Sequence, residues 1–135
     1  MEESKLENPE IGHALEEIGR LLAEDVGTDP DGTFLYAEFG DGWVAPSITK
    51  DTGERVISPE PSFDLMENLM NIWEMVVPDK RWTSMQYEIK DGRFDVKFGY
   101  DEFTEANVHD VDRLEMLVRQ RYGDKPIEYI EPQSP

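Results

Sequence analysis

Short turn sequences separate stretches rich in β-forming residues, and they constrain the fold more than any other feature of this chain. Gly and Asp mark three such turns, at 40–42, 50–53 and 90–93. Turns this short join neighbouring strands as antiparallel pairs, because a parallel connection needs a crossover of a dozen or more residues. The sequence therefore predicts antiparallel pairing and excludes a sheet built from parallel βαβ units.

Five strands are predicted around these turns. The residues between the turns are dense in aromatic and β-branched side chains, and Pro59 and Pro61 end the first group. Phe94, Val96 and Phe98 alternate with polar residues, which predicts one buried and one polar face. The expected strands are 33–39, 43–48, 55–58, 82–89 and 94–100. The first three form a meander and the last two form a hairpin.

Three amphipathic helices complete the prediction. The first covers 9–26, where apolar residues recur at spacings of three and four. The second begins after Ser62 and ends before Pro78, and the third covers 108–122. These elements predict an α+β fold, with about three helices packed on an antiparallel sheet that consists of the meander and the hairpin.

Length and composition fit one domain. With 135 residues, three Trp, six Phe and five Tyr, the chain can fill a single core. Residues 1–126 are predicted to form this domain, and residues 127–135 a short Pro-containing C-terminal tail. The sequence contains neither a secretory signal nor a run of about 18 apolar residues, so we expect a cytoplasmic protein. Because cysteine is absent, disulfides and thiolate zinc sites are excluded.

The net charge indicates what kind of partner this chain binds. It has 31 Asp and Glu against 13 Lys and Arg, a formal charge of −18, whereas solubility needs a magnitude of only roughly 2–8. A field of that sign repels nucleic-acid phosphates and anionic membranes and attracts basic proteins. We therefore expect a basic protein partner, and neither nucleic acid nor membrane. The sequence also leaves open a homodimer formed through apolar surface on the meander.

The acidic residues concentrate between the predicted hairpin and the last helix. Part of this cluster serves the helix dipole, because Asp110 and Asp112 fall in the first turn of that helix. The rest is a candidate surface for a basic partner, and two acids of the first meander extend it. The candidate partner-binding residues are Asp101, Glu102, Glu105, Asp110, Asp112, Glu115, Glu38 and Asp41.

The three tryptophans are candidate anchors for a partner, although a tryptophan in a strand or on an apolar helix face usually belongs to the core. Trp43 and Trp73 are accordingly predicted to be core residues. Trp82 begins a strand directly after two cations, so it is the one we expect to be partly exposed.

Two other chemistries remain open. Asp29, Asp31 and Glu38 fall at the third, fifth and twelfth places of the EF-hand spacing, which makes a calcium-binding module one alternative. Gly27 occupies the first place, however, and a strand follows where a helix is required. A small hydrolase using His109 and a carboxylate is the second alternative. The familiar nucleophile, phosphate-loop and metalloprotease motifs are absent, so we expect no enzyme activity and no cofactor.

Five short segments carry a pattern that covers the chain from Ile11 to Glu102. They are Leu35-Tyr36-Ala37-Glu38, Ile72-Trp73-Glu74, Trp82-Thr83-Ser84-Met85-Gln86-Tyr87, Asp91-Gly92-Arg93-Phe94-Asp95-Val96 and Phe98-Gly99-Tyr100-Asp101. In this order they resemble the YezG-like antitoxin or immunity family. The resemblance implies an acidic α+β protein that binds and neutralises a polymorphic secreted toxin, often a nuclease, in the producing cell. After Asp101 the chain departs from the family pattern, which has a longer helical end.

Overall fold

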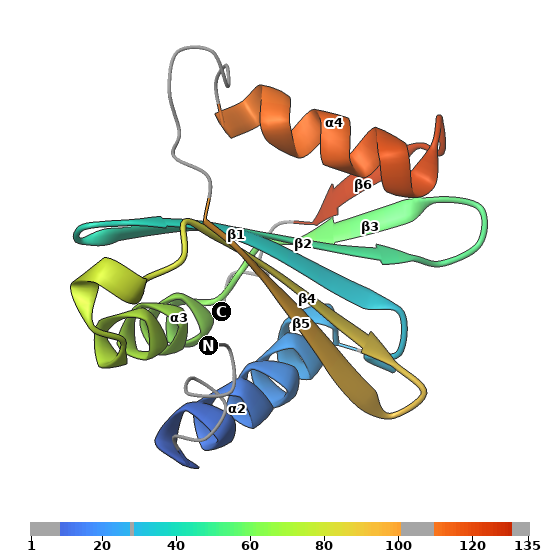
Figure 1. Cartoon of the computed structure of the whole chain (residues 1–135). Coiled ribbons are helices and arrows are strands. Elements are labelled where there is room, and N and C mark those ends of the chain that lie inside the picture. The colour runs from blue at the N-terminus through green and yellow to red at the C-terminus, as the bar shows by residue number, and fades with distance from the viewer. Residues whose placement is uncertain (1–8, 28, 101–109, 131–135) are drawn as a thin grey trace.

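The computed structural model describes residues 9–27, 29–100 and 110–130 and confirms the predicted α+β fold (Figure 1). The elements are α2 (Pro9–Val26), β1 (Thr33–Gly40), β2 (Trp43–Asp51), β3 (Val56–Pro59), α3 (Phe63–Met75), a 3₁₀ helix (Pro78–Lys80), β4 (Ser84–Lys90), β5 (Arg93–Gly99), α4 (Asp110–Tyr122) and β6 (Ile127–Ile130). The meander and the hairpin form a single sheet, because β1 pairs with both β2 and β4.

The sheet has six strands in the order β5-β4-β1-β2-β3-β6. Every pairing is antiparallel except that of β3 with β6. α2 and α3 cover one face of the sheet, and α4 lies on the other (Figure 1). No helix in the described part of the chain is long and apolar enough to cross a bilayer.

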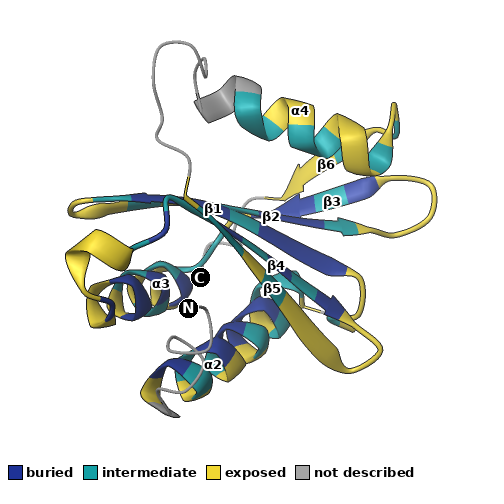
Figure 2. Ribbon diagram, in the orientation of Figure 1, coloured by how far each residue is buried: buried dark blue, intermediate teal, exposed yellow. Residues whose placement is uncertain are grey.

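The core lies between the sheet and the two helices α2 and α3, which turn a buried stripe toward it (Figure 2). Leu35, Ala37 and Phe39 of β1 point into this core, since alternate residues of a strand share a face. The hydroxyl of Tyr87 donates to the carbonyl of Leu15 at 2.7 Å, so the buried phenol has a partner. Burial raises the pKa of Tyr87 above its usual value.

Side chains form hydrogen bonds with the free backbone N–H and C=O groups at the two ends of α3. The hydroxyl of Ser62 accepts from the N–H of Leu65 at 3.2 Å, as a helix cap does. At the other end, the guanidinium of Arg81 donates to the carbonyls of Trp73 and Val76 and lies 4.5 Å from the centre of the Trp73 ring. Arg81 therefore stabilises the fold.

The β4–β5 hairpin has the two-residue turn that its sequence predicts. Asp91 and Gly92 occupy it with φ angles of 54° and 75°, the left-handed region that an Asp-Gly pair adopts readily in such turns. The apolar face of β5 is less covered than predicted: Phe94 is 38% exposed, and Val96 and Phe98 are only partly buried. The reason is that β5 lies at the edge of the described sheet and has β4 as its one neighbouring strand there.

The structure corrects two predictions about tryptophan. Trp82, expected to be partly exposed, is 1% exposed and packs against the rings of Phe39 and Phe98. Trp43, expected in the core, is 46% exposed. Register explains the second difference: Val44 pairs with Phe39 on the core face, so the preceding residue points to the opposite face of the sheet.

Residues 127–130 belong to the sheet, whereas the sequence predicted a tail from 127 to 135. They form β6, and the N–H of Val56 and of Glu60 donate to the carbonyls of Pro126 and Ile130 at 2.8 and 3.0 Å. Sequence reasoning missed this strand because four residues behind a helix carry too little alternation to be told from a tail. Residues 131–135 lie outside the described part.

Deleting residues 127–135 is expected to lower the free energy of unfolding by about 2–4 kcal/mol. β3 would lose a hydrogen-bonded neighbour, and the buried Val56 would gain exposure. Urea denaturation followed by circular dichroism measures the change, and deletion of 131–135 alone, which keeps β6, is the control. Equal stability of the full chain and the shorter chain would contradict a structural role for β6.

Candidate protein-binding surface

The structure separates the acidic residues that the sequence places in one cluster. Asp101, Glu102 and Glu105 lie outside the described residues. Asp110 and Asp112 lie in the first turn of α4, and their side chains are outside the described part as well. The binding role predicted for these five residues stays a prediction.

The three remaining candidates have different surroundings. Glu115 is exposed on α4 and pairs with Arg119 one turn later at 3.1 Å. Asp41 is exposed in the turn between β1 and β2. Glu38 is only 2% exposed, which corrects its assignment to a partner-facing surface.

Glu38 is bound by Arg113 of α4 in a two-pronged ion pair. The Nε of Arg113 donates to Oε2 at 2.8 Å, and its Nη2 donates to Oε1 at 2.7 Å. The hydroxyl of Tyr36, on the same face of β1, also donates to Oε2, at 2.5 Å. Each carboxylate oxygen therefore accepts a charged hydrogen bond, which a buried charge requires. We call these three residues the clamp.

The contacts within the clamp raise the pKa values of Arg113 and Tyr36. The hydrogen bond with Glu38 raises the pKa of Arg113 above its usual value. Burial, together with the hydrogen bond to Glu38, raises the pKa of Tyr36. Because Arg113 stays charged and Tyr36 stays neutral at physiological pH, the cluster suits a structural role better than proton transfer.

Other polar contacts hold the rest of α4 on the sheet. Arg121 pairs with Glu88 of β4 and lies 4.0 Å from the centre of the Phe34 ring. The hydroxyls of Tyr122 and Thr49 form a hydrogen bond at 2.8 Å. None of the side chains described in α4 is fully buried, in contrast to α2 and α3 (Figure 2). Polar contacts, more than an apolar stripe, therefore position this helix.

The clamp places the start of α4 at the end of the sheet where β1 turns into β2. β5 ends there too, because Glu38 and Gly99 are both register partners of Ser84. The acidic segment 101–109 thus joins two described elements that meet at this end. The turn with Asp41 lies at the same end, which we call the hairpin end.

Trp43 presents a half-exposed indole at the hairpin end. The ring lies against Gly40, its register partner, and a Cβ at that glycine would overlap the ring. The indole is therefore held by the backbone while 46% of the residue remains exposed. An aromatic ring that is ordered before binding loses little conformational entropy when a partner covers it, which favours a role as an interface anchor.

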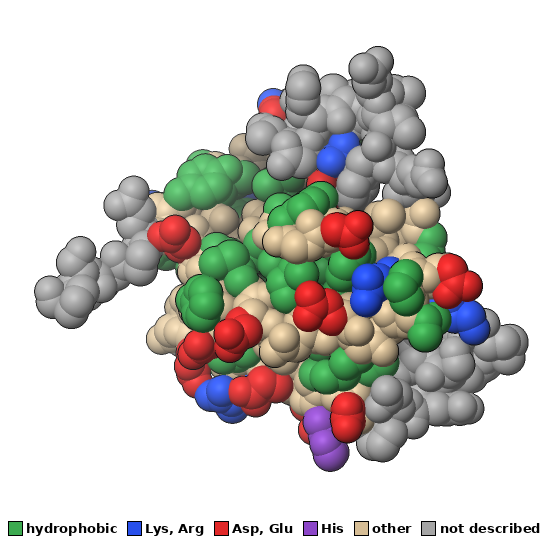
Figure 3. All heavy atoms as spheres, turned by 90° about the vertical axis from the view of Figure 1, so that its left-hand side faces the viewer, with side chains coloured by type: hydrophobic (Ala, Val, Ile, Leu, Met, Phe, Trp, Pro, Cys, Tyr) green, Lys and Arg blue, Asp and Glu red, His purple; other side chains and the backbone are tan. Residues whose placement is uncertain are grey.

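The end of α3 and the residues directly after it bring further apolar and acidic side chains to the hairpin end. The last turn of α3 reaches this end because the rings of Trp73 and Phe39 stack with centroids 6.3 Å apart. Met75 and Val77 are 40% and 55% exposed there. Figure 3 looks onto this side of the molecule and shows acidic side chains around apolar ones. We define the hairpin-end surface as Asp41, Trp43, Glu74, Met75, Val77, Asp79 and Tyr100.

Most cations of the described residues are engaged within the fold. Those in ion pairs are Arg20, Arg55, Arg113, Arg119, Arg121 and Lys125. Lys50 and Arg81 donate to backbone carbonyls. α3 contributes three acidic residues and no Lys or Arg. Near the hairpin-end surface, Lys80 and Arg81 keep their positive charge, since Arg81 donates to the neutral carbonyls of Trp73, Glu74 and Val76.

The structure does not bring the predicted calcium ligands together. Oδ1 of Asp29 accepts from the N–H of Asp31 at 3.0 Å, and Oδ1 of Asp31 accepts from the N–H of Asp91. Glu38 lies five residues beyond Thr33 along β1, about 17 Å away at roughly 3.4 Å per residue. Within the described ranges, no three Asp, Glu or His side chains are grouped to hold a metal. The two aspartates instead order the turns.

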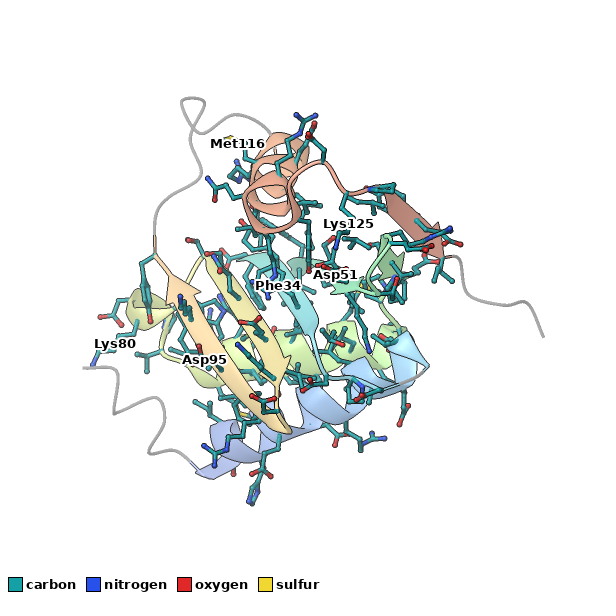
Figure 4. All side chains as sticks on the ribbon, turned by 90° about the vertical axis from the view of Figure 1, so that its right-hand side faces the viewer. Phe34, Asp51, Lys80, Asp95, Met116 and Lys125 are labelled. Atoms are coloured by element: carbon teal, nitrogen blue, oxygen red, sulfur yellow. The ribbon has the colours of Figure 1, made fainter. Side chains whose placement is uncertain are left out.

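A cavity of about 400 Å³ lies between α4 and the strands β2, β3 and β6. Thr49, Ser58 and Lys125 are among its lining residues, and the lining contains no histidine. Lys125 pairs with Asp51 at 2.8 Å (Figure 4), and the hydrogen bonds from Lys125 and from the N–H of Gly53 lower the pKa of Asp51. Both lining cations are thus paired with carboxylates, since Arg119 pairs with Glu115.

The histidine of the hydrolase alternative, His109, lies outside the described residues. The other histidine, His13, is exposed on α2. The structure therefore brings no described histidine together with a carboxylate in a cavity.

Sequence reasoning missed the apolar part of the hairpin-end surface. It assigned Trp43 to the core and gave Met75 and Val77 no role in binding. The available signal was the turn at 40–42: a tryptophan directly after a tight turn lies at the end of the sheet, where it has fewer neighbours.

Comparison with known proteins leaves the family of this chain unassigned. No protein-family model matches it, and no curated protein matches it. The surface described above is therefore the main basis for a functional proposal.

Replacing Arg113 by alanine is expected to lower the free energy of unfolding by about 3 kcal/mol, because the buried Glu38 carboxylate loses its cation. Adding Glu38→Gln to that variant should restore part of the loss. Urea denaturation of both single variants and the double variant measures the coupling, and purely additive effects would contradict the clamp.

Proposed function

We propose that this chain is an immunity protein or antitoxin that binds and neutralises a basic, nuclease-type toxin through the hairpin-end surface. The observation that carries the proposal is the half-exposed Trp43, which packs against Gly40 at the same end of the sheet as the exposed Asp41. The net charge of −18 and the segments that resemble the YezG-like family support the same function. The proposed action takes place in the cytoplasm of the producing cell and requires no catalysis by this chain.

Carboxylates on the hairpin-end surface match the chemistry of a nuclease. A nuclease holds the phosphates of its substrate with Lys and Arg side chains. Asp41, Glu74 and Asp79 can pair with such cations, and Arg in particular binds a carboxylate in a two-pronged geometry. A toxin whose cations are covered in this way can no longer bind nucleic acid.

The apolar side chains of the hairpin-end surface supply binding free energy that exposed carboxylates do not provide. Exposed ion pairs contribute only about 0–1 kcal/mol each, so charge alone does not hold a complex together. Trp43, Met75 and Val77 are exposed apolar side chains at this end of the sheet, and aromatic residues and Met are enriched at the centres of interfaces. In this arrangement the acidic field speeds association, and the buried indole slows dissociation.

The test uses, as the candidate toxin, a basic nuclease domain encoded by a neighbouring gene. Coexpression of this domain with the chain is expected to restore growth, and the purified proteins should associate more slowly as salt rises, with less change in dissociation. Trp43→Ala should speed dissociation roughly 30-fold, equivalent to about 2 kcal/mol for an interface hot spot. Asp41→Lys should slow association. Surface plasmon resonance measures both rates.

Two further variants sharpen the result. Glu54→Lys makes the same charge change in the β2–β3 turn, at the opposite end of β2, and should slow association less than Asp41→Lys. Gly40→Ala should displace the indole without removing it and speed dissociation as Trp43→Ala does. Equal effects of the two lysine variants would argue against a defined surface, and growth arrest that persists on coexpression would overturn the proposal.

A further inference from the structure

β5 is an exposed edge of the sheet, and its sequence is complementary to itself. Its one neighbour in the described sheet is β4, and Figure 4 shows it as the outermost strand, with Asp95 on it. The backbone groups of an uncovered edge can bind another strand. We propose that two copies of this chain pair through β5 and form an antiparallel dimer with one continuous sheet. This inference is independent of the proposed immunity function.

The backbone of β5 is oriented for such pairing. In a hairpin with a two-residue turn, the residue directly after the turn, here Arg93, is hydrogen-bonded to the partner strand, and the bonds recur at every second residue. The backbone of Gly99 is likewise turned toward the strand before it, since its carbonyl accepts from the N–H of Thr83 at 2.7 Å. The backbone N–H and C=O groups of Phe94 and Val96 therefore point away from the sheet.

One register pairs the whole length of both strands. Two identical antiparallel strands are related by a twofold axis, and the full-length register places this axis at Val96. Asp95 of each copy then lies opposite Lys97 of the other, so the dimer contains this pair of unlike charges twice. Both pairs occupy positions between hydrogen-bonded residues, where side chains approach most closely.

The charges disfavour the neighbouring registers. An axis at Asp95 or at Lys97 places that residue opposite its own copy, with like charges in contact. An axis at Phe94 places Arg93 of one copy opposite Asp95 of the other, which are unlike charges. In this register, however, the paired residues would have to include the turn at 91–92. The chain bends there with positive φ angles, which leaves only the three residues from Arg93 paired. Charge thus excludes the axes at Asp95 and Lys97, and the turn excludes the axis at Phe94.

Both faces of β5 have side chains that a second copy can cover. Asp95 and Lys97 are exposed, and neither takes part in an ion pair within the described ranges. On the other face, Phe94 is 38% exposed although it stacks on Tyr87 with centroids 5.0 Å apart. A cavity of about 500 Å³ lies between α2 and this hairpin, with Phe94 in its lining. Pairing lays Phe98 of the second copy beside Phe94.

Local charge also favours this edge for self-association. The chain carries −18 overall, which opposes contact between two copies. From Ser84 to Gly99, however, it has three acidic and three basic residues, so the hairpin is neutral. Two copies can therefore meet through the hairpin without local repulsion.

Charge reversal tests the proposal through its register. Asp95→Lys places two lysines opposite each other, and Lys97→Asp places two aspartates opposite each other. Each variant alone should show a dissociation constant raised roughly tenfold or more. An equimolar mixture of the two variants restores unlike charges in both contacts and should form heterodimers. Sedimentation velocity over a dilution series, with the purified chain and no toxin, measures each state.

Two controls separate pairing from folding. Val96→Pro removes an outward N–H that β4 does not use, so it should give a folded monomer by circular dichroism. Glu54→Lys reverses a charge away from the edge and should leave the dimer unchanged. A wild-type chain that stays monomeric at the highest concentration overturns the proposal. So does a mixture of the two charge variants that associates no better than either variant alone.

Discussion

β1 is the central strand of the sheet, and its need for cover on both faces determines the arrangement of the other elements. One face carries Leu35, Ala37 and Phe39 and is covered by the apolar stripes of α2 and α3. The other carries Tyr36 and Glu38, whose polar atoms require partners once they are buried. Arg113 provides that partner, so α4 docks by satisfying a buried charge. A buried ion pair of this kind specifies position more than it adds net stability.

The proposed binding surface depends on this clamp. By fixing the start of α4 over the end of β1, it brings both described neighbours of the segment 101–109 to the hairpin end. The exposed Trp43 and the acidic, cation-free α3 reach the same end. Polar contacts on one face of the sheet and apolar packing on the other therefore converge on one surface, where charge and an ordered aromatic ring lie together.

Local signals were sufficient to predict most of the fold. Tight turns and residue periodicity are properties of neighbouring residues, so the meander, the hairpin and the helices α2 and α3 could be predicted from them. Glu38 was misassigned because its burial depends on Arg113, which is distant in the sequence, and no local pattern marks that pair. The exposures of Trp43 and Trp82 depend likewise on strand register. β6 forms through its pairing with β3, and the four residues of β6 contain no local pattern that predicts this pairing.

The two proposed surfaces of this chain differ in how they depend on charge. Recognition of a basic toxin uses the long-range field of −18, which salt screens, so that association weakens as ionic strength rises. Pairing through β5 must occur against the same field, because both copies carry it, and it relies on backbone hydrogen bonds and short-range contacts. Added salt weakens the repulsion between copies. Under the two proposals, the neutral hairpin and the acidic hairpin end therefore respond to salt in opposite directions.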